Sequence, residues 1–209
     1  MTSLTQAKEA LFDHLQRIIT DQRVLRAFLQ VPREAFIPRS FQLQSYDDQP
    51  LPIGKGQTIS QPTTVLLMTQ YLDVRAGQNI LEIGTGSGYQ AALLSVLVGN
   101  KGKIITTEII KELFQASAKS LRPYKNVRVL HIDGSQGYSK KAPYDRIIVT
   151  AACPKAPLHL LEQLTNDGLL LAPVGDAYVQ KLLRFHKDGS SESFGDFLFV
   201  PLTGKYGVS

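Results

Sequence analysis

The chain is poor in residue types that would define several classes of protein. Its 209 residues include one cysteine, Cys153, and no tryptophan, and a single cysteine excludes a disulfide framework within the chain. No stretch reaches the roughly 18 consecutive apolar residues of a membrane span. The first residues also lack the basic segment and apolar run of a secretory signal. These absences predict a soluble protein of a reducing compartment, the cytoplasm, with no membrane partner.

Charge of one sign is not concentrated anywhere in the sequence. The 23 Lys and Arg residues outnumber the 18 Asp and Glu residues, which gives a net charge of +5. A non-enzymatic module that binds RNA would cluster these cations between aromatic side chains, but here they are dispersed. We therefore interpret the excess as a solubility charge, expect no nucleic-acid partner and treat the basic binding module as the weakest alternative.

Motifs for metal binding and for covalent catalysis are also missing. The four histidines are scattered, and none has a partner at ligand spacing. No G-x-S-x-G nucleophile elbow occurs. We expect no metal and interpret Cys153 as a structural thiol.

What the sequence does contain is the pattern of an α/β domain. Apolar residues at intervals of three and four predict a helix over residues 4–19 and a second one over 21–29, with Asp21 as its cap. Two prolines end this region, and residues 39–61 are expected to form an irregular substrate or lid loop. A further helix is predicted from Pro62 to Leu72, since proline is tolerated in a first helical turn.

From residue 79 onward, predicted strands and helices alternate. Strands are expected at 79–83, 103–107, 126–130, 145–149 and 168–172, and helices at 89–98, 111–121 and 157–164. Such alternation builds a parallel sheet with helices on both faces. The segments 178–187 and 194–200 lack a helix between them and predict an antiparallel pair. The fold class is therefore α/β, a doubly wound and mostly parallel sheet with an N-terminal helical extension and antiparallel C-terminal strands.

The strongest motif joins the strand at 79–83 directly to a helix. Gly84, Gly86 and Gly88 follow an apolar strand that carries Glu82. A dinucleotide fingerprint has the pattern G-x-G-x-x-G, but here Tyr89 stands at the place of the last glycine. The G-x-G-x-G spacing instead resembles motif I of class I methyltransferases, in which the loop faces the methionine part and the ribose of S-adenosylmethionine.

Two acidic residues follow the next two strands. Glu108 lies 24 residues after Gly84 (108 − 84), at the end of the second strand, where a carboxylate can accept hydrogen bonds from ribose hydroxyls. Asp133, before Gly134, follows the third strand. Acidic residues at that place bind the adenine amino group in class I methyltransferases, and we expect the same of Asp133.

The absence of a convincing catalytic base bears on the acceptor. Methyl transfer from a sulfonium is an in-line displacement that requires alignment and exclusion of water. An amine or hydroxyl acceptor must also lose a proton, whereas a carboxylate with a pKa of about 3.5 to 4 is already ionised at neutral pH. The sequence is thus compatible with a carboxyl methyltransferase, although other acceptors stay open on this ground alone.

Several segments resemble protein-L-isoaspartate O-methyltransferases. They include Tyr46 to Gly54, Gly56 to Pro62 with its Thr-Ile-Ser-Gln-Pro run, Leu81 to Ala91, Asp133 to Gly137, Ala142 to Ala152 and Val200 to Leu202. The matches occur in order over nearly the whole chain. The Thr-Ile-Ser-Gln-Pro run is the match specific to this family, whereas motif I is shared with many methyltransferases. The resemblance implies methylation of the free α-carboxylate of isoaspartyl residues in damaged proteins. The methyl ester then closes to a succinimide and partly reopens to aspartate.

The resemblance also assigns residues. Ser60 matches the active-site serine, and its hydroxyl would hold the substrate carboxylate. Taken by itself, Ser60 is also placed to cap the helix that begins at Pro62. The implied cofactor contacts come from Thr58, Ile59, Glu82, Gly84, Thr85, Gly86, Ser87, Gly88, Glu108, Ile109, Asp133, Gly134 and Thr203. The implied substrate contacts come from Ile53, Gly54, Gln57, Ser60, Val200, Pro201 and Leu202.

The expected cofactor is S-adenosyl-L-methionine, with S-adenosyl-L-homocysteine as product, and the expected partners are isoaspartyl peptides and proteins. We expect a monomer in which residues 1–61 supply helices and the substrate loop and residues 62–209 form the cofactor-binding domain. An alternative is a related carboxyl methyltransferase that acts on a dedicated peptide or a small-molecule acceptor. Ile132, Thr63 and Thr64 depart from residues common in the family.

Overall fold

The computed structural model describes residues 3–208. The chain begins with helices α1 (Leu4–Leu15) and α2 (Gln22–Gln30). Ser3 and Gln6 form a capping box at the start of α1, which satisfies backbone donors that a helix leaves unpaired. The Asp21 carboxylate accepts a hydrogen bond from the Arg23 backbone amide at 2.8 Å and caps α2. Helix α2 and its Asp21 cap are as predicted, whereas α1 ends at Leu15 and not at residue 19.

The segment between α2 and the next helix is more regular than we expected. It contains two short 3-10 helices, η1 (Arg33–Phe36) and η2 (Arg39–Gln44), and an antiparallel hairpin of β1 (Leu51–Gly54) and β2 (Gln57–Ile59). The turn is possible because Gly54, Lys55 and Gly56 all adopt positive φ, at 92°, 56° and 71°. The prediction of an irregular loop over 39–61 is wrong at this hairpin.

A seven-stranded sheet forms the centre of the molecule. Its strands are β3 (Asn79–Ile83), β4 (Lys103–Glu108), β5 (Val127–His131), β6 (Tyr144–Val149), β7 (Leu164–Gly175), β8 (Gln180–His186) and β9 (Ser191–Phe197). Their order is β5-β4-β3-β6-β7-β8-β9. Pairing is parallel from β5 to β7 and antiparallel from β7 to β9. The predicted fold class is confirmed.

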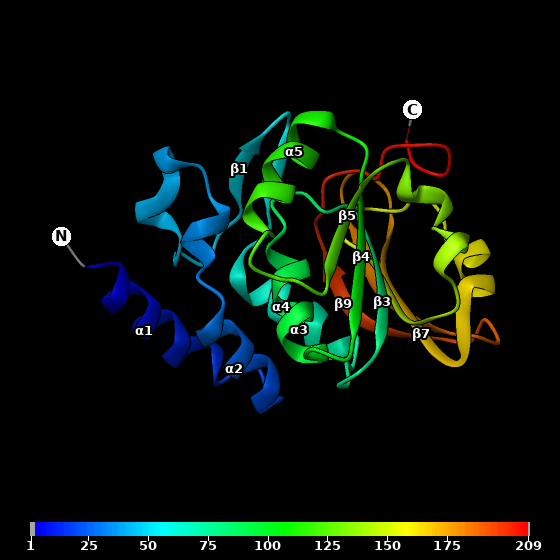
Figure 1. The fold of residues 1–209 in the computed structure, drawn as a ribbon, viewed down its shortest axis with the longest axis horizontal. Helices are drawn as coiled ribbons and strands as arrows, with labels where there is room; N and C mark the ends of the chain where they lie inside the picture. Colours follow the sequence, from blue (N-terminus) through cyan, green and yellow to red (C-terminus); the bar gives the residue numbers. More distant parts are fainter. Residues whose placement is uncertain (1–2, 209) are drawn as a thin grey trace.

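Helices cover both faces of the sheet, as Figure 1 shows. On one face lie α3 (Pro62–Tyr71), α4 (Tyr89–Val98) and α5 (Lys111–Ser120). On the other lie the 3-10 helices η3 (Gly134–Gln136), η4 (Ser139–Lys141) and η5 (Leu158–Gln163). The helix expected at 157–164 is the 3-10 helix η5, which ends at Gln163 directly before β7 begins.

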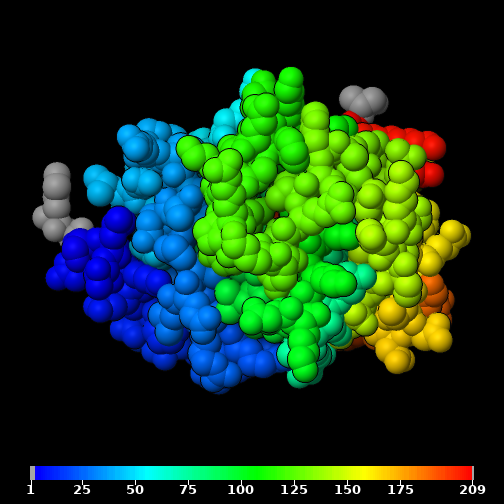
Figure 2. All heavy atoms as spheres, in the orientation of Figure 1, coloured from blue at the N-terminus to red at the C-terminus, as the bar shows by residue number. Residues whose placement is uncertain are grey.

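The N-terminal helices share a hydrophobic core with the sheet domain. One buried cluster runs from Leu15 and Phe28 through Leu66 and Tyr89 to Ile104, and Figure 2 shows the N-terminal helices packed directly against the body of the molecule. Removing α1 and α2 would therefore expose apolar side chains of α3 and α4. Within residues 3–208, no helix has the length and apolar character to cross a membrane.

Candidate active site

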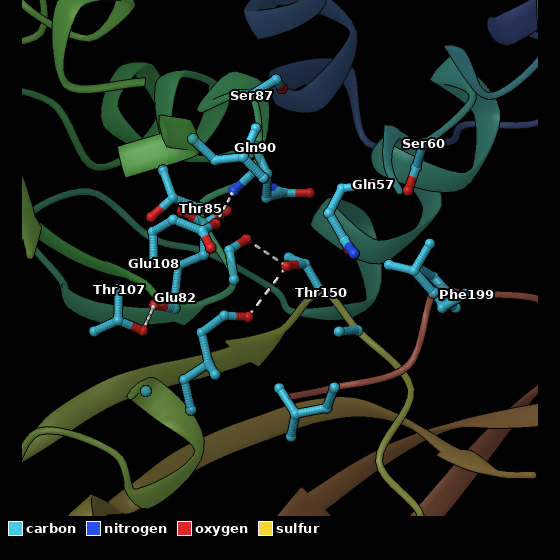
Figure 3. Close-up of a pocket in the computed structure, with 18 of the residues that line it drawn as sticks. Gln57, Ser60, Glu82, Thr85, Ser87, Gln90, Thr107, Glu108, Thr150 and Phe199 are labelled. Carbon is cyan, nitrogen blue, oxygen red and sulfur yellow. Dashed lines mark hydrogen bonds between the residues drawn. The ribbon is translucent and has the colours of Figure 1, made fainter. Parts of the chain in front are cut away.

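A pocket lies where the strand order reverses. The chain passes from β3 outward through β4 to β5 and then returns to β6 on the other side of β3. Loops after β3 and β6 diverge at such a point, which leaves a crevice at the carboxyl ends of the strands. The pocket that occupies this place is shown in Figure 3.

Two walls enclose the pocket. The strand-end wall consists of residues 82–87, 107–110, 134–135 and 150–151, which end or follow the parallel strands. The outer wall consists of residues 57–60, from the hairpin, and 199–203, which follow β9. Figure 3 shows Glu82, Thr85 and Glu108 on one side and Gln57, Ser60 and Phe199 on the other.

Most of the predicted site residues line this pocket. They are Gln57, Thr58, Ile59, Ser60, Glu82, Gly84, Thr85, Gly86, Ser87, Glu108, Ile109, Gly134, Val200, Pro201, Leu202 and Thr203. Segments up to 146 residues apart in sequence (203 − 57) thus meet in one cavity. Their individual contacts with ligands stay predictions.

The glycine loop turns sharply at the end of β3. Gly84 and Gly86 adopt φ of +96° and +52°, which L side chains rarely take up. A Cβ on Gly84 would lie 2.6 Å from the Thr150 hydroxyl oxygen. That hydroxyl donates to the Gly84 carbonyl at 2.5 Å, so the loop can be built only with glycine at this position.

Glu108 holds the same loop from the end of β4. Its Oε2 accepts from the Gly86 amide at 2.8 Å, and its Oε1 accepts from the Ile110 amide at 2.9 Å. A carboxylate has about four acceptor sites, so two hydrogen bonds leave capacity for hydroxyl groups of a ligand. Because Glu108 borders the pocket and is only 6% exposed, this remaining capacity faces a shielded space.

Glu82 is the second acid of the strand-end wall. Its side chain has no solvent exposure, and neither carboxyl oxygen has a hydrogen-bond partner among residues 3–208. Burial raises the pKa of Glu82 to about 8. A buried acid without a partner is costly, and it lines the pocket. Its position is therefore that of a group that a cationic ligand would satisfy.

The outer wall presents Ser60 and Gln57 to the pocket, as Figure 3 shows. The N-cap of α3 is Gln61, and the cap makes no side-chain hydrogen bond within the described chain. The alternative in which Ser60 caps this helix is therefore wrong. The residues that follow β9 are held in place by Ala152, whose amide donates to the Val200 carbonyl at 2.8 Å and whose carbonyl accepts from the Leu202 amide at 2.9 Å.

Four predicted residues lie outside the pocket lining. Gly88 packs close to α5, since a Cβ there would lie 3.0 Å from Leu121 side-chain carbons. The Ile53 side chain lies next to the glycine loop, 3.5 Å from where a Gly86 Cβ would be, and Gly54 forms the hairpin turn.

Asp133 is the fourth. Its carboxylate accepts from the Ser135 and Lys205 amides, each at 2.9 Å. Burial raises the pKa of Asp133, but these hydrogen bonds outweigh it and lower the pKa overall. The structure thus directs Asp133 toward the C-terminal segment, and its neighbour Gly134 lines the pocket instead.

The sequence reasoning missed several lining residues, among them Tyr89, Gln90, Thr107, Ser135, Thr150 and Phe199. Thr150 directly follows β6, so the rule that ligands bind at the carboxyl ends of parallel strands would have found it. Gln90 donates to the Thr69 hydroxyl of α3 at 2.9 Å, a contact between two helices that no local pattern predicts.

Of the residues that the structure describes, Glu82 and Glu108 are the two acids that line the pocket, and no histidine lines it. Within residues 3–208, no group of three or more His, Cys, Asp or Glu side chains is arranged to hold a metal ion. Cys153 is 1% exposed, and burial raises the pKa of its thiol to about 12, so it stays protonated at neutral pH.

The fold and the pocket together are those of a class I S-adenosylmethionine-dependent methyltransferase. A solved protein-L-isoaspartate O-methyltransferase matches 96% of this chain and 67% of its own, at 28% identity and a TM-score of 0.86. One from Plasmodium falciparum, in complex with S-adenosyl-L-homocysteine, matches 94% of this chain and 98% of its own, at 26% identity and a TM-score of 0.84.

The chain belongs to the protein-L-isoaspartate(D-aspartate) O-methyltransferase family, whose sequence model matches residues 6–207. A protein-L-isoaspartate O-methyltransferase of Methanosarcina mazei is 46% identical over 96% of this chain and 84% of its own length. Another of Methanococcus maripaludis is 49% identical over 90% of this chain and 91% of its own. The family resemblance inferred from the motifs is confirmed.

Proposed function

We propose that this chain transfers a methyl group from S-adenosyl-L-methionine to the free α-carboxylate of isoaspartyl residues in damaged peptides and proteins. Relatives that carry this activity in their names are 46% to 49% identical to the chain. The observation that carries the proposal is the pocket itself. It sets Ser60, on the outer wall, across from the acids and glycines of the strand-end wall.

The strand-end wall fits S-adenosylmethionine. The φ-positive glycine loop is a cradle in which a Cβ at Gly84 would collide with Thr150. Glu108 keeps acceptor capacity for the ribose hydroxyls. Glu82, buried and unpartnered among the described residues, suits the positively charged methionine end. When bound, S-adenosylmethionine supplies an activated methyl group on a positively charged sulfur.

The outer wall would receive the acceptor. We propose that the Ser60 hydroxyl donates a hydrogen bond to one carboxylate oxygen and leaves the other oxygen free to point at the methyl group. One edge of residues 200–202 is bound to Ala152, and its other edge would hold the extended backbone of the substrate. Ile59 and Phe199 provide apolar surface in the wall, which excludes water from the reacting atoms.

No proton has to be removed from this acceptor. An α-carboxyl group has a pKa of about 3.3 to 3.7 and is ionised at neutral pH. The residues around the acceptor therefore need to orient an anion and shield it, which a serine and an apolar wall can do. Esterification removes the negative charge, so the hydrogen bond from Ser60 weakens to an ordinary neutral one and the product is held less tightly.

The two walls do not coincide with two parts of the chain, because residues 199–203 of the outer wall follow the central sheet in sequence. We propose that residues 1–61 supply the hairpin that contacts the acceptor and that residues 62–209 bind the cofactor. We further propose a monomer that needs no metal, and we propose the cytoplasm as its compartment because a single cysteine gives the chain no disulfide framework.

The activity is tested with matched peptides. Transfer of labelled methyl from S-adenosylmethionine is measured with a peptide that contains one isoaspartyl residue and with the same peptide containing aspartate. We expect base-labile methyl ester only on the isoaspartyl peptide. Equal labelling of both peptides, or of neither while S-adenosylhomocysteine still binds in calorimetry, would contradict the proposed acceptor.

A further inference from the structure

Arg33 is the largest fully buried polar side chain of the molecule's described part and lies next to the active site. It belongs to η1 and has no solvent exposure. Its Nε donates to the Ser45 carbonyl at 2.9 Å, and its Nη2 donates to the Ser60 carbonyl at 2.8 Å. The guanidinium carbon lies 5.1 Å from the centroid of the Tyr89 ring.

In the described part of the chain, no carboxylate contacts the charge of Arg33 directly, and Asp48 attracts it only at longer range. No Asp or Glu within residues 3–208 forms an ion pair with it, and its Nη1 has no hydrogen-bond partner there. Burial lowers the pKa of Arg33 to about 10, so the side chain stays charged at neutral pH. A buried, unpaired cation costs stability relative to an apolar residue of the same size. Packing alone is therefore a poor account of Arg33.

The contacts of Arg33 join two parts of the active site. Ser60 is the residue of the outer wall that would orient the acceptor. Tyr89 directly follows Gly88 and begins α4, so its ring marks the end of the glycine loop. The Tyr89 ring also packs against Phe36 of η1, with centroids 5.7 Å apart. The Arg33 guanidinium thus lies between Ser60 and the glycine loop that is proposed to bind the cofactor.

We propose that Arg33 is a positioning residue that fixes Ser60 relative to the glycine loop. The inference rests on the proposed function, in which Ser60 orients the carboxylate of the methyl acceptor. Arg33 is fastened to the outer wall by its hydrogen bond to the Ser60 carbonyl and to the end of the glycine loop by its contact with Tyr89. Together these two contacts fix the distance between Ser60 and the glycine loop. Displacement of a reacting group by about 1 Å can cost on the order of 100-fold in rate.

The test compares Arg33→Met and Arg33→Lys with the wild-type protein. Methionine keeps the apolar bulk and removes both hydrogen bonds, whereas lysine keeps the charge and can reach one carbonyl. We expect kcat on an isoaspartyl peptide to fall about 10- to 100-fold in Arg33→Met and less in Arg33→Lys. The Kd for S-adenosylhomocysteine should change by less than about threefold, since the cofactor wall is intact.

Leu15→Ala is the matched control for lost stability. Leu15 lies in α1, is fully buried and does not line the pocket. Below its unfolding temperature this variant should keep the wild-type kcat. If Arg33→Met lowered the unfolding temperature as Leu15→Ala does and kcat stayed at the wild-type value, Arg33 would be structural only.

A second measurement does not depend on the acceptor. Hydrogen exchange with S-adenosylhomocysteine bound should show amides of residues 57–61 exchanging about tenfold faster in Arg33→Met than in wild type, with no such change in Leu15→Ala. Unchanged exchange in Arg33→Met would overturn the positioning role. If the wild-type protein methylated no isoaspartyl peptide, the proposed function would fail and the exchange result would still decide the role of Arg33.

Discussion

The two walls of the pocket are built in different ways. The strand-end wall follows directly from β3, β4 and β6, so its backbone is held by the hydrogen bonds of the central sheet. The outer wall combines the segment after β9, which backbone hydrogen bonds fasten to Ala152, with a short hairpin that side chains tie to the rest of the molecule. These ties include Arg33 to the Ser60 carbonyl, Asp48 to Thr63 and Lys55 to Glu112.

Because the two walls are built differently, substitutions in each wall should impair a different step. Changes in the strand-end wall should alter cofactor affinity and leave the acceptor geometry alone. Changes that remove or displace Ser60 in the outer wall should alter turnover and leave cofactor affinity alone. The predictions below can sharpen that separation or break it.

The largest effect is expected from Ser60→Ala. Loss of the hydroxyl removes the hydrogen bond proposed to orient the acceptor carboxylate, and a misplaced reacting group costs on the order of 100-fold in kcat. Affinity for S-adenosylhomocysteine, measured by calorimetry, should stay within about twofold. Ser193→Ala, an exposed serine on β9, is the matched control and should behave as wild type. Full activity of Ser60→Ala would remove Ser60 from the mechanism.

Glu108→Ala should produce the opposite pattern. The carboxylate accepts from the Gly86 amide and is proposed to bind the ribose, so its loss should weaken S-adenosylhomocysteine binding by about 10- to 100-fold. At saturating cofactor, kcat should fall much less than in Ser60→Ala. The control is Glu162→Ala, an exposed acid beside β7. Unchanged affinity in Glu108→Ala would refute the ribose contact.

Glu82→Gln should change how stability depends on pH. Burial raises the pKa of Glu82 to about 8 in the folded protein from 4.5, so the folded state keeps a proton that the unfolded state has released. Wild-type stability from this group is fully present below pH 4.5 and is lost as pH rises toward 8. In the ligand-free protein, Glu82→Gln should therefore gain roughly 1–2 kcal/mol on wild type between pH 6 and 8. The free energy of unfolding is measured for both proteins from pH 6 to 8. If it changed with pH equally in both, Glu82 would already be ionised in the folded wild-type protein.

Lys55→Ala should have the smallest effect. Lys55, in the hairpin turn, and Glu112, at the start of α5, form an ion pair of 2.5 Å between largely exposed side chains. Such pairs are weak and screened by salt. Release of S-adenosylhomocysteine, followed by stopped flow at low salt, should speed up about two- to fivefold, and the difference should vanish in 0.5 M NaCl, where the Debye length is only about 4 to 5 Å. A salt-independent change would point to a role other than this pair.

Much of the fold was predictable because its signals are local. The apolar strands, the glycines after β3 and the periodic apolar faces of α1 and α2 each lie within a few consecutive residues. The hairpin of β1 and β2 was missed because its strands are only four and three residues long, too short for an alternation to stand out. The helix at 157–164 was misassigned because its apolar residues suit a 3-10 helix as well as an α-helix.

The strand-end wall could be inferred from the amino-acid sequence alone, because Glu82 to Ser87 and Glu108 are contiguous with the strands that carry them. Three contacts became visible only in the folded molecule: Arg33 reaches Ser60, 27 residues away, Asp133 turns to the C-terminal segment, and Thr150 closes over Gly84. Such contacts join segments whose separation along the chain says nothing about their distance in space. They form only when the sheet and its helices have packed into one core.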